Sequence, residues 1–267
     1  MMTLIAVVIA VLATIPVVAI VVTASYLGVP MRHGSIYEKV QHVWARTVVF
    51  GAGVRTRVHG AEHIEQRDAC VYVANHVSWY DVFCLASVLP RWSFVAKQEL
   101  RNIPIFGRGA EAVGTIFVQR QSRKSAAEMY AKAALRINEG ASVVVFAEGT
   151  RGHDYPLRPF KKGSFVLAMT AGVPIIPVLI MGTREVMPAG QWLVHAGVVN
   201  IHFLAPIPTA GVAFSDRERL IAQVWSSMAN AMLSLYGIES DRRNALGTEE
   251  PAERASTAHE PGAVTQQ

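Results

Sequence analysis

The stretch VYVANHVSWYDVF, residues 71–83, places an Asn-His pair directly after a run of apolar β-formers. Residues 69–74 are typical of a fully buried strand, and residues 78–89 of the helix that follows it. In open α/β sheets, functional groups gather where the strands end at their carboxyl edge. We therefore expect His76 to lie at such an edge, with Asp81 close to the first turn of the following helix.

Strand and helix patterns alternate along the rest of the chain. Strand-like runs occupy residues 54–59, 91–96, 114–118, 142–147, 175–181 and 199–204, and helical runs occupy residues 125–138, 164–171 and 215–236. Two helical runs open with capping-box spacing, Ser125 to Glu128 and Ser215 to Glu218. This alternation predicts an α/β fold with a mostly parallel sheet flanked by helices.

Residues 1–31 contain no charged side chain and are almost wholly apolar. About 20 apolar residues span a bilayer, so this segment predicts a transmembrane or re-entrant membrane anchor before the α/β domain. Pro16 lies in its middle, where proline kinks a helix or divides it into two re-entrant halves. A secretory signal would carry a basic start and a shorter apolar core, and a core helix would not be apolar on every side.

Basic residues flank the apolar segment only on its carboxyl side, with Arg32, Lys39 and Arg46. The positive-inside rule then places the rest of the chain in the cytoplasm, at the inner membrane of the cell. Cys70 and Cys84 agree with a reducing compartment, because neither has a metal-type or redox spacing. Both are expected to be small core residues.

Four regions are expected: an anchor at 1–31, an amphipathic helix at 32–53, an α/β domain at 54–238 and a disordered tail at 239–267. The amphipathic helix would turn an apolar stripe toward either a membrane surface or the body of the protein. That stripe consists of Ile36, Val40, Val43, Trp44 and Val48.

The formal net charge of +5 is unevenly distributed. The tail carries six acidic residues and three arginines, which leaves +8 on the rest of the chain. A basic body beside a membrane anchor predicts anionic lipid as a surface or a substrate. A nucleic-acid partner is not expected, because the chain has no dense Lys/Arg run, no zinc-ligand spacing and no interleaved aromatic motif.

His76 and Asp81 have the relation of a general base and the carboxylate that fixes its tautomer. Two simpler interpretations remain open: His76 as a core histidine, and Asp81 as the end of a capping box that begins at Ser78. The sequence contains no G-x-S-x-G, H-E-x-x-H, Walker A or strand-linked G-x-G-x-x-G motif. Without a protein nucleophile, the base would act on the hydroxyl of a bound substrate, and a group would pass directly to that acceptor alcohol.

Several cations lie at or near the expected strand ends: Arg120, Arg151, Lys97, Lys161 and Lys162. Guanidinium groups bind phosphate through two parallel hydrogen bonds, so this grouping favours an anionic acceptor. For each cation taken alone, the alternative is a solvated surface side chain.

Four blocks of sequence together resemble one known family. NHVSWYD (75–81), GTIFVQR (114–120), VFAEGTR (145–151) and VPIIPV (173–178) are similar, in order and spacing, to the successive blocks of the glycerolipid acyltransferase family, typified by lysophosphatidic acid acyltransferases. The resemblance covers residues 54–208, which would form the acyltransferase domain. AKQEL (96–100) and PFKKGSF (159–165) are similar to connecting segments of that family.

The resemblance implies a role for each matching residue. His76 would be the general base that deprotonates the acceptor hydroxyl, and Asp81 would orient it. The remaining residues would bind the acceptor: Arg120 and Arg151 on its phosphate, Lys97 as an assisting cation, and Glu148, Gly149 and Thr150 shaping the site.

The family implies a membrane-bound 1-acylglycerol-3-phosphate O-acyltransferase of phospholipid biosynthesis. It would move an acyl group from acyl-CoA or acyl-carrier protein, as co-substrate, to the free sn-2 hydroxyl of 1-acylglycerol 3-phosphate, giving phosphatidic acid. Neither a cofactor nor a metal is expected. The alternatives are the same chemistry on lyso-ornithine lipid, another lysophospholipid or a glycolipid, hydrolysis of the thioester, and a non-catalytic membrane-surface binding module.

Two residues depart from the family's pattern. Ala147 stands where proline is more usual before the Glu-Gly-Thr-Arg turn, and Gly152 stands where serine is common. Both changes are expected to loosen the turn and to leave the reacting groups intact. They therefore bear on the identity of the acceptor more than on the reaction.

Overall fold

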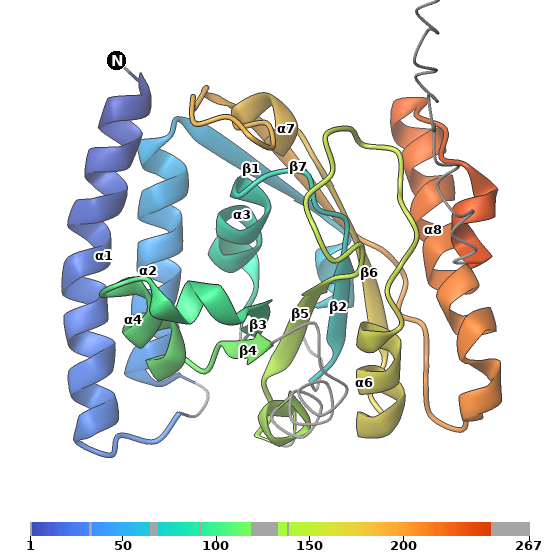
Figure 1. Ribbon diagram of the computed structural model, residues 1–267, viewed down its shortest axis with the longest axis horizontal. Helices are drawn as coiled ribbons and strands as arrows, with labels where there is room; N and C mark the ends of the chain where they lie inside the picture. Colours follow the sequence, from blue (N-terminus) through green and yellow to red (C-terminus); the bar gives the residue numbers. More distant parts are fainter. Residues whose placement is uncertain are drawn as a thin grey trace, which may run out of the picture.

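The computed structural model describes residues 2–31, 34–64, 69–90, 92–118, 133–137 and 139–246. Its centre is a seven-stranded sheet with the strand order β1-β7-β6-β2-β5-β3-β4 (Figure 1). Neighbouring strands are parallel except β6 and β7, which are antiparallel, so the predicted, mostly parallel α/β sheet is confirmed. The strands are β1 (Val54–His59), β2 (Val71–Ala74), β3 (Trp92–Lys97), β4 (Ile116–Val118), β5 (Ser142–Phe146), β6 (Ile175–Met181) and β7 (Gly197–Phe203).

Helices cover both faces of the sheet, with α1 to α4 on one side and α6 and α8 on the other (Figure 1). The helices are α1 (Met2–Tyr26), α2 (Ile36–Gly51), α3 (Tyr80–Val88), α4 (Phe106–Ala112), α6 (Gly163–Ala171), α7 (Thr183–Val186) and α8 (Arg217–Tyr236). Residues 133–137 are also helical. Single 3₁₀ turns lie at η1 (Ala61–His63), η2 (Gln98–Asn102), η3 (Phe214–Asp216) and η4 (Arg242–Leu246).

The central strand β2 is apolar throughout because both of its faces are covered. Val71 and Val73 belong to the core under α6 and α8, whereas Tyr72 and Ala74 belong to the core under α2 and α3. Side chains alternate between the faces of a strand, so a strand covered on both faces has no polar position. Fully burying an apolar side chain of either core contributes about 1.5–3 kcal/mol to stability.

The N-terminal segment forms one continuous helix, α1, which runs through Pro16 and is not divided into two halves. Among the described residues, α1 is the one helix long and apolar enough to cross a membrane. It packs lengthwise on α2: Trp44 Nε1 donates a hydrogen bond to Thr14 Oγ1 (2.9 Å), and Gly51 leaves room for Ile9, whose Cγ2 would lie 2.6 Å from an added Cβ. Figure 1 shows the two helices side by side at one flank of the domain.

The amphipathic helix α2 differs in part from the prediction. Val48 of the expected apolar stripe is buried, but Ile36 is 39 % exposed and Val43 is 64 % exposed, on a side that also carries Phe50 at 84 %. The reason is that α2 packs on both α1 and α3, so two sides of the helix are covered and Tyr37 and Ala45 are also buried. The spacing of apolar residues alone does not reveal which side of α2 is left uncovered by α1 and α3.

The two predicted capping boxes have different outcomes. The box from Ser125 to Glu128 lies outside the described residues. The box from Ser215 to Glu218 is not formed, because α8 begins at Arg217 without a side-chain cap, and Glu218 instead pairs with Lys162 (2.8 Å). The turn η3 precedes the helix and displaces its start from the position that the spacing indicated.

The packed body continues past residue 238. Ser240 is buried, and its hydroxyl accepts a hydrogen bond from the Leu157 backbone N–H (2.9 Å). The remainder of the predicted tail, from residue 247, lies outside the described residues. Cys70 and Cys84 form no disulfide and are fully buried, as expected.

Candidate active site

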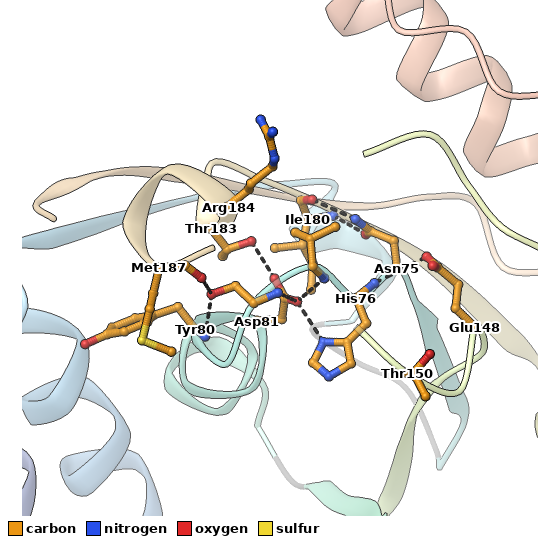
Figure 2. Close-up of polar contacts among 12 residues, drawn as sticks. Asn75, His76, Tyr80, Asp81, Glu148, Thr150, Ile180, Thr183, Arg184 and Met187 are labelled. Carbon is orange, nitrogen blue, oxygen red and sulfur yellow. Dashed lines mark hydrogen bonds and ion pairs between the residues drawn. The ribbon is translucent and has the colours of Figure 1, made fainter. Parts of the chain in front are cut away.

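A histidine–carboxylate pair lies at the carboxyl end of β2. His76 Nδ1 and Asp81 Oδ2 are 2.8 Å apart, and the Asp81 side chain is fully buried while that of His76 is 13 % exposed (Figure 2). The imidazole stacks on Phe146 of the neighbouring strand β5, with ring centroids 3.9 Å apart. Because Asp81 holds Nδ1, the nitrogen left for a substrate is Nε2, which no group in the described part of the chain hydrogen-bonds.

The Asp81 carboxylate serves two purposes at once. Its Oδ2 accepts hydrogen bonds from the backbone N–H groups of Val77 and Ser78 (both 2.8 Å), which is the capping interaction. The same oxygen accepts from His76, and Oδ1 accepts from the Thr183 hydroxyl (2.5 Å). Asp81 thus contacts the backbone N–H of Ser78, as the capping-box spacing predicts, and also hydrogen-bonds the imidazole; its role as the orienter of His76 stays a prediction.

The end of β2 is held by the side-chain amide of Asn75, which forms the same pair of hydrogen bonds as a backbone amide in a β-ladder. Asn75 is fully buried, and its amide accepts from the Ile180 N–H (2.8 Å) and donates to the Ile180 carbonyl (2.9 Å), as Figure 2 shows. The ladder between β2 and β6 ends at Ala74 and Val178, so Asn75 extends it beyond the last paired residue. This bond fixes the direction in which the next residue, His76, leaves the sheet.

Strand β5 ends in the turn that carries Glu148 to Arg151. Glu148 is buried: Oε1 accepts from the His76 backbone N–H (3.4 Å) and Oε2 from Arg158 Nε (2.7 Å). Burial raises the pKa of Glu148 to about 7, although the Arg158 guanidinium opposes this change. Gly149 has a φ of 82°, which suits glycine at this turn. Glu148 thus braces the turn against His76 and has little surface to offer a substrate.

Arg158 was not identified from the sequence, yet it holds this turn together. Besides Glu148, its guanidinium donates to the Thr150 hydroxyl (3.2 Å) and to the Thr150 carbonyl. In the sequence, Arg158 is simply a basic residue just before PFKKG. That position does not show whether the side chain pairs with a buried carboxylate or is solvated at the surface. The structure therefore places Thr150 against Arg158.

Arg151 and Lys97 differ in how firmly they are held. The Arg151 guanidinium lies 4.6 Å from the centroid of the Trp79 ring, a cation–π contact, and no described carboxylate pairs with it. The next residue, Gly152, donates its N–H to the His76 carbonyl (2.7 Å), so Arg151 lies close to the histidine. Lys97 is exposed at the end of β3, two strand spacings or about 10 Å across the sheet from β2. Arg120 lies outside the described residues.

The two departures from the family pattern lie where backbone hydrogen bonds anchor the turn. The Ala147 N–H donates to the Ala74 carbonyl (3.3 Å), a bond that a proline could not make, and its carbonyl accepts from the Lys161 N–H (2.7 Å). At Gly152, the bond to His76 ties the turn to β2. The expectation of a looser turn stays a prediction.

Helix α7 supports the pair from the other side, and no sequence motif indicated this contact. Gly182 adopts a φ of 102° and directs Thr183 toward Asp81. The Tyr155 hydroxyl accepts from the Gly182 N–H (2.7 Å) and donates to Glu185 (2.6 Å), and burial raises the pKa of Tyr155. Tyr155 thus joins the loop after Arg151 to the turn that carries Thr183.

The arrangement suits proton transfer with a substrate. A buried carboxylate on Nδ1 stabilises the imidazolium that forms when Nε2 takes a proton. The nearby hydroxyls are committed elsewhere, since Ser78 donates to the Met187 carbonyl (2.7 Å) and Thr183 donates to Asp81. Neither is placed as a nucleophile, which leaves the hydroxyl of a bound molecule as the group to be activated.

Comparisons with known proteins identify the family of the chain. A family model described as Acyltransferase matches residues 55–181. The 1-acyl-sn-glycerol-3-phosphate acyltransferase of Haemophilus influenzae is 33 % identical over 70 % of this chain and 77 % of its own length. The human beta enzyme of that name is 30 % identical over 77 % of this chain and 76 % of its own.

Two further relatives bear on length and fold. The chloroplastic 1-acyl-sn-glycerol-3-phosphate acyltransferase BAT2 of Brassica napus is 33 % identical over 63 % of this chain, which spans about half (49 %) of that protein. The crystal structure of the 1-acyl-sn-glycerophosphate acyltransferase PlsC from Thermotoga maritima matches with a TM-score of 0.73 and 27 % identity, over 90 % of this chain and 97 % of that one. The chain therefore belongs to the glycerolipid acyltransferase family, of the type typified by 1-acylglycerol-3-phosphate acyltransferases.

Proposed function

We propose that this protein transfers an acyl group from a thioester, acyl-CoA or acyl-carrier protein, to the sn-2 hydroxyl of 1-acylglycerol 3-phosphate. The observation that carries the proposal is the free Nε2 of His76, held by the buried Asp81 and lying near the stacked guanidinium of Arg151. The names of the relatives support the same acceptor.

The reaction needs one base and no covalent enzyme intermediate. His76 Nε2 takes the proton of the acceptor hydroxyl as its oxygen attacks the thioester carbonyl. The tetrahedral intermediate then expels the thiolate, which receives that proton from the imidazolium, so the products are an ester and a free thiol. Asp81 stabilises the transient imidazolium, and its four hydrogen bonds keep it from turning away.

The acceptor's phosphate would lie on Arg151, with Arg120 and Lys97 as the further cations. Stacking on Trp79 restricts the Arg151 guanidinium without using its N–H donors, which leaves them available for phosphate oxygens. Glu148, Gly149 and Thr150 would act through the shape of the turn that presents Arg151. The family's chemistry calls for no cofactor or metal, and the residues around His76 are those of proton transfer.

The membrane would hold the acceptor and the enzyme together. Helix α1 is long and apolar enough to enter a bilayer, and the basic residues that follow it favour the cytoplasmic side of the inner membrane. Both substrates fit that location, since a lysolipid resides in the bilayer and an acyl thioester in the cytoplasm.

The test is acyl transfer by the detergent-purified full chain, with a labelled acyl thioester and a panel of acceptors. We expect phosphatidate from lysophosphatidate, and a loss of about 10²- to 10⁴-fold in rate for His76→Ala. His153→Ala, which alters an exposed histidine on the loop after Arg151, is the matched control and should retain activity.

Other outcomes separate the alternatives. Histidine-dependent product from lyso-ornithine lipid, another lysophospholipid or a glycolipid, but none from lysophosphatidate, would replace the acceptor and keep the mechanism. Thioester hydrolysis unaffected by any acceptor would indicate a hydrolase. No turnover of the thioester under any condition would indicate a non-catalytic binding module.

A further inference from the structure

The connection between η2 and α4 exposes two isoleucines in an unusual conformation. Ile103 is 44 % exposed and Ile105 is 53 % exposed. Ile105 has a φ of 67°, and no other non-glycine residue in the described ranges has a positive φ. A β-branched residue rarely adopts this conformation, and such strain concentrates at functional segments. We call residues 103–105 the isoleucine turn.

The isoleucine turn is followed by helix α4, which packs closely on α1. A Cβ at Gly107 would lie 2.0 Å from the Arg101 carbonyl oxygen, so the chain closes tightly behind the turn. A Cβ at Gly109 would lie 2.6 Å from Val18, so α4 lies directly against α1, as Figure 1 also shows. Arg101 and Glu111 form an ion pair (2.6 Å) across the base of the turn. The isoleucines are therefore held outward.

A groove of about 470 Å³ runs between the isoleucine turn and α1. Its walls are apolar and include Val18 and Val22 of α1 and Pro104 and Ile105 of the turn. Arg108 lies at its border, is exposed, and has no acidic partner among the described residues. An apolar groove bordered by one unpaired cation fits an amphiphile that has an apolar chain and an anionic head.

We infer that the isoleucine turn is a second membrane-contacting element, and that its groove takes an acyl chain of an anionic bilayer phospholipid with Arg108 near the phosphate. The inference rests on the proposed function only in that α1 meets the membrane. Helix α1 leaves a broad apolar side exposed, including Leu4 at 69 % and Leu12 at 64 %, and the isoleucines extend that surface. Exposed apolar surface of this extent, with a cation at its border, is characteristic of membrane contact.

The position of the isoleucine turn links it to the active site. It begins six residues after Lys97, which ends β3 at the same carboxyl edge of the sheet as His76. Membrane contact at the turn brings the bilayer to the side of the domain from which a lysolipid would approach that edge. A water-soluble acceptor has no need of this contact.

Site-directed spin labelling tests the placement, because the native Cys70 and Cys84 are fully buried and an introduced cysteine is the accessible thiol. Ile105→Cys is compared with Leu235→Cys, which lies on α8 across the sheet and is equally exposed at 53 %. Leu12→Cys reports on α1. In vesicles of phosphatidylglycerol and phosphatidylcholine, we expect the labels at 105 and 12 to be relaxed by oxygen and shielded from a water-soluble nickel complex, and the label at 235 to show the reverse.

The outcomes separate this inference from the proposed function. A label at 105 that is open to the nickel complex while the label at 12 is shielded would overturn the inference alone. Labels at 105 and 12 that are both open would overturn the membrane attachment itself. Either result leaves the transfer assay in detergent unaffected.

Activity gives an independent readout. We expect Ile105→Asp to lower the rate severalfold with lysophosphatidate in vesicles and to leave the rate with a water-soluble short-chain acceptor unchanged, with Leu235→Asp as the control. Arg108→Gln should remove a preference for phosphatidylglycerol over phosphatidylcholine vesicles, whereas Arg219→Gln, exposed on α8, should keep it. If Ile105→Asp lowered the rate equally with both acceptors, the substitution would be disturbing the folded protein itself and not its contact with the membrane. That result would overturn the inference.

Discussion

Two buried carboxylates lie at the tips of the neighbouring strands β2 and β5, and they have different surroundings. Asp81 receives four hydrogen bonds on its two oxygens, three of them at 2.8 Å and one at 2.5 Å. Glu148 receives one bond from Arg158 and one long backbone contact at 3.4 Å, and its pKa rises to about 7. Both side chains are buried, but only Asp81 has every donated bond at 2.8 Å or less, and only Asp81 contacts the imidazole.

The largest effect is expected from Asp81→Asn. The amide matches the carboxylate in shape and can keep its oxygen toward the three donors on Oδ2, but it is neutral and cannot stabilise the imidazolium. We expect kcat to fall by about 10² to 10⁴-fold, as for loss of the base itself. Asp154→Asn, which changes an exposed carboxylate, is the control. If Asp81→Asn retained the wild-type kcat, Asp81 would not be needed to orient His76, and the two carboxylates would not differ in this role.

A smaller loss is expected from Thr183→Val, which deletes one donor to Asp81 and keeps the side-chain shape. Loss of a single hydrogen bond to a charged group corresponds to about a tenfold fall in kcat. Thr183→Ser restores the hydroxyl and should be close to wild type. A fall in kcat without rescue by serine would point to packing alone.

A pH effect on stability is expected from Glu148. Its pKa rises from 4.5 to about 7 on folding, so the folded protein binds this proton more tightly than the unfolded chain. The free energy of unfolding should therefore decline as pH rises from about 4.5 to about 7, and remain lower above that range. Thermal unfolding of wild type and Glu148→Gln across these pH values measures it, with exposed Glu99→Gln as the control. Parallel pH profiles of wild type and Glu148→Gln would contradict the assignment.

The smallest effect is expected from Trp79→Leu, which removes the aromatic ring under Arg151. A cation–π contact at a partly exposed site is worth about 0.5–1 kcal/mol, or a rise of about two- to fivefold in KM for lysophosphatidate. Trp79→Phe should retain most of the affinity. An acceptor without phosphate should show no change, and an equal rise for that acceptor would argue against a phosphate role for Arg151.

Contacts between residues that are close in the sequence could be predicted, whereas contacts between distant residues could not. His76 and Asp81 are five residues apart, so a strand followed by a helix was enough to bring them together. Thr183 reaches Asp81 from 102 residues away, and Asn75 reaches Ile180 across 105. No spacing rule predicts such contacts, because they depend on the order of strands in the sheet.

Burial of charge was equally hard to predict. Arg158 lies in a run of cations, and only the three-dimensional turn shows that it pairs with a buried carboxylate. On α2, periodicity identified an amphipathic helix but not its uncovered side, which depends on α1 and α3. The sheet itself was predictable, because its buried strands are continuous apolar runs between helical segments.

The pairing of the first strand with the last has a consequence for synthesis. Among the described strands, β1 lies at the sheet edge and pairs with β7 alone, starting with Val54 beside Gly197. At 5–20 residues per second, a ribosome needs roughly 7–30 s to make the intervening residues. During that time β1 emerges with both edges unpaired, and Arg55 and Arg57 supply the charges that discourage association with other chains. Helix α1 precedes it from the ribosome, so the nascent chain can reach the membrane before its sheet closes.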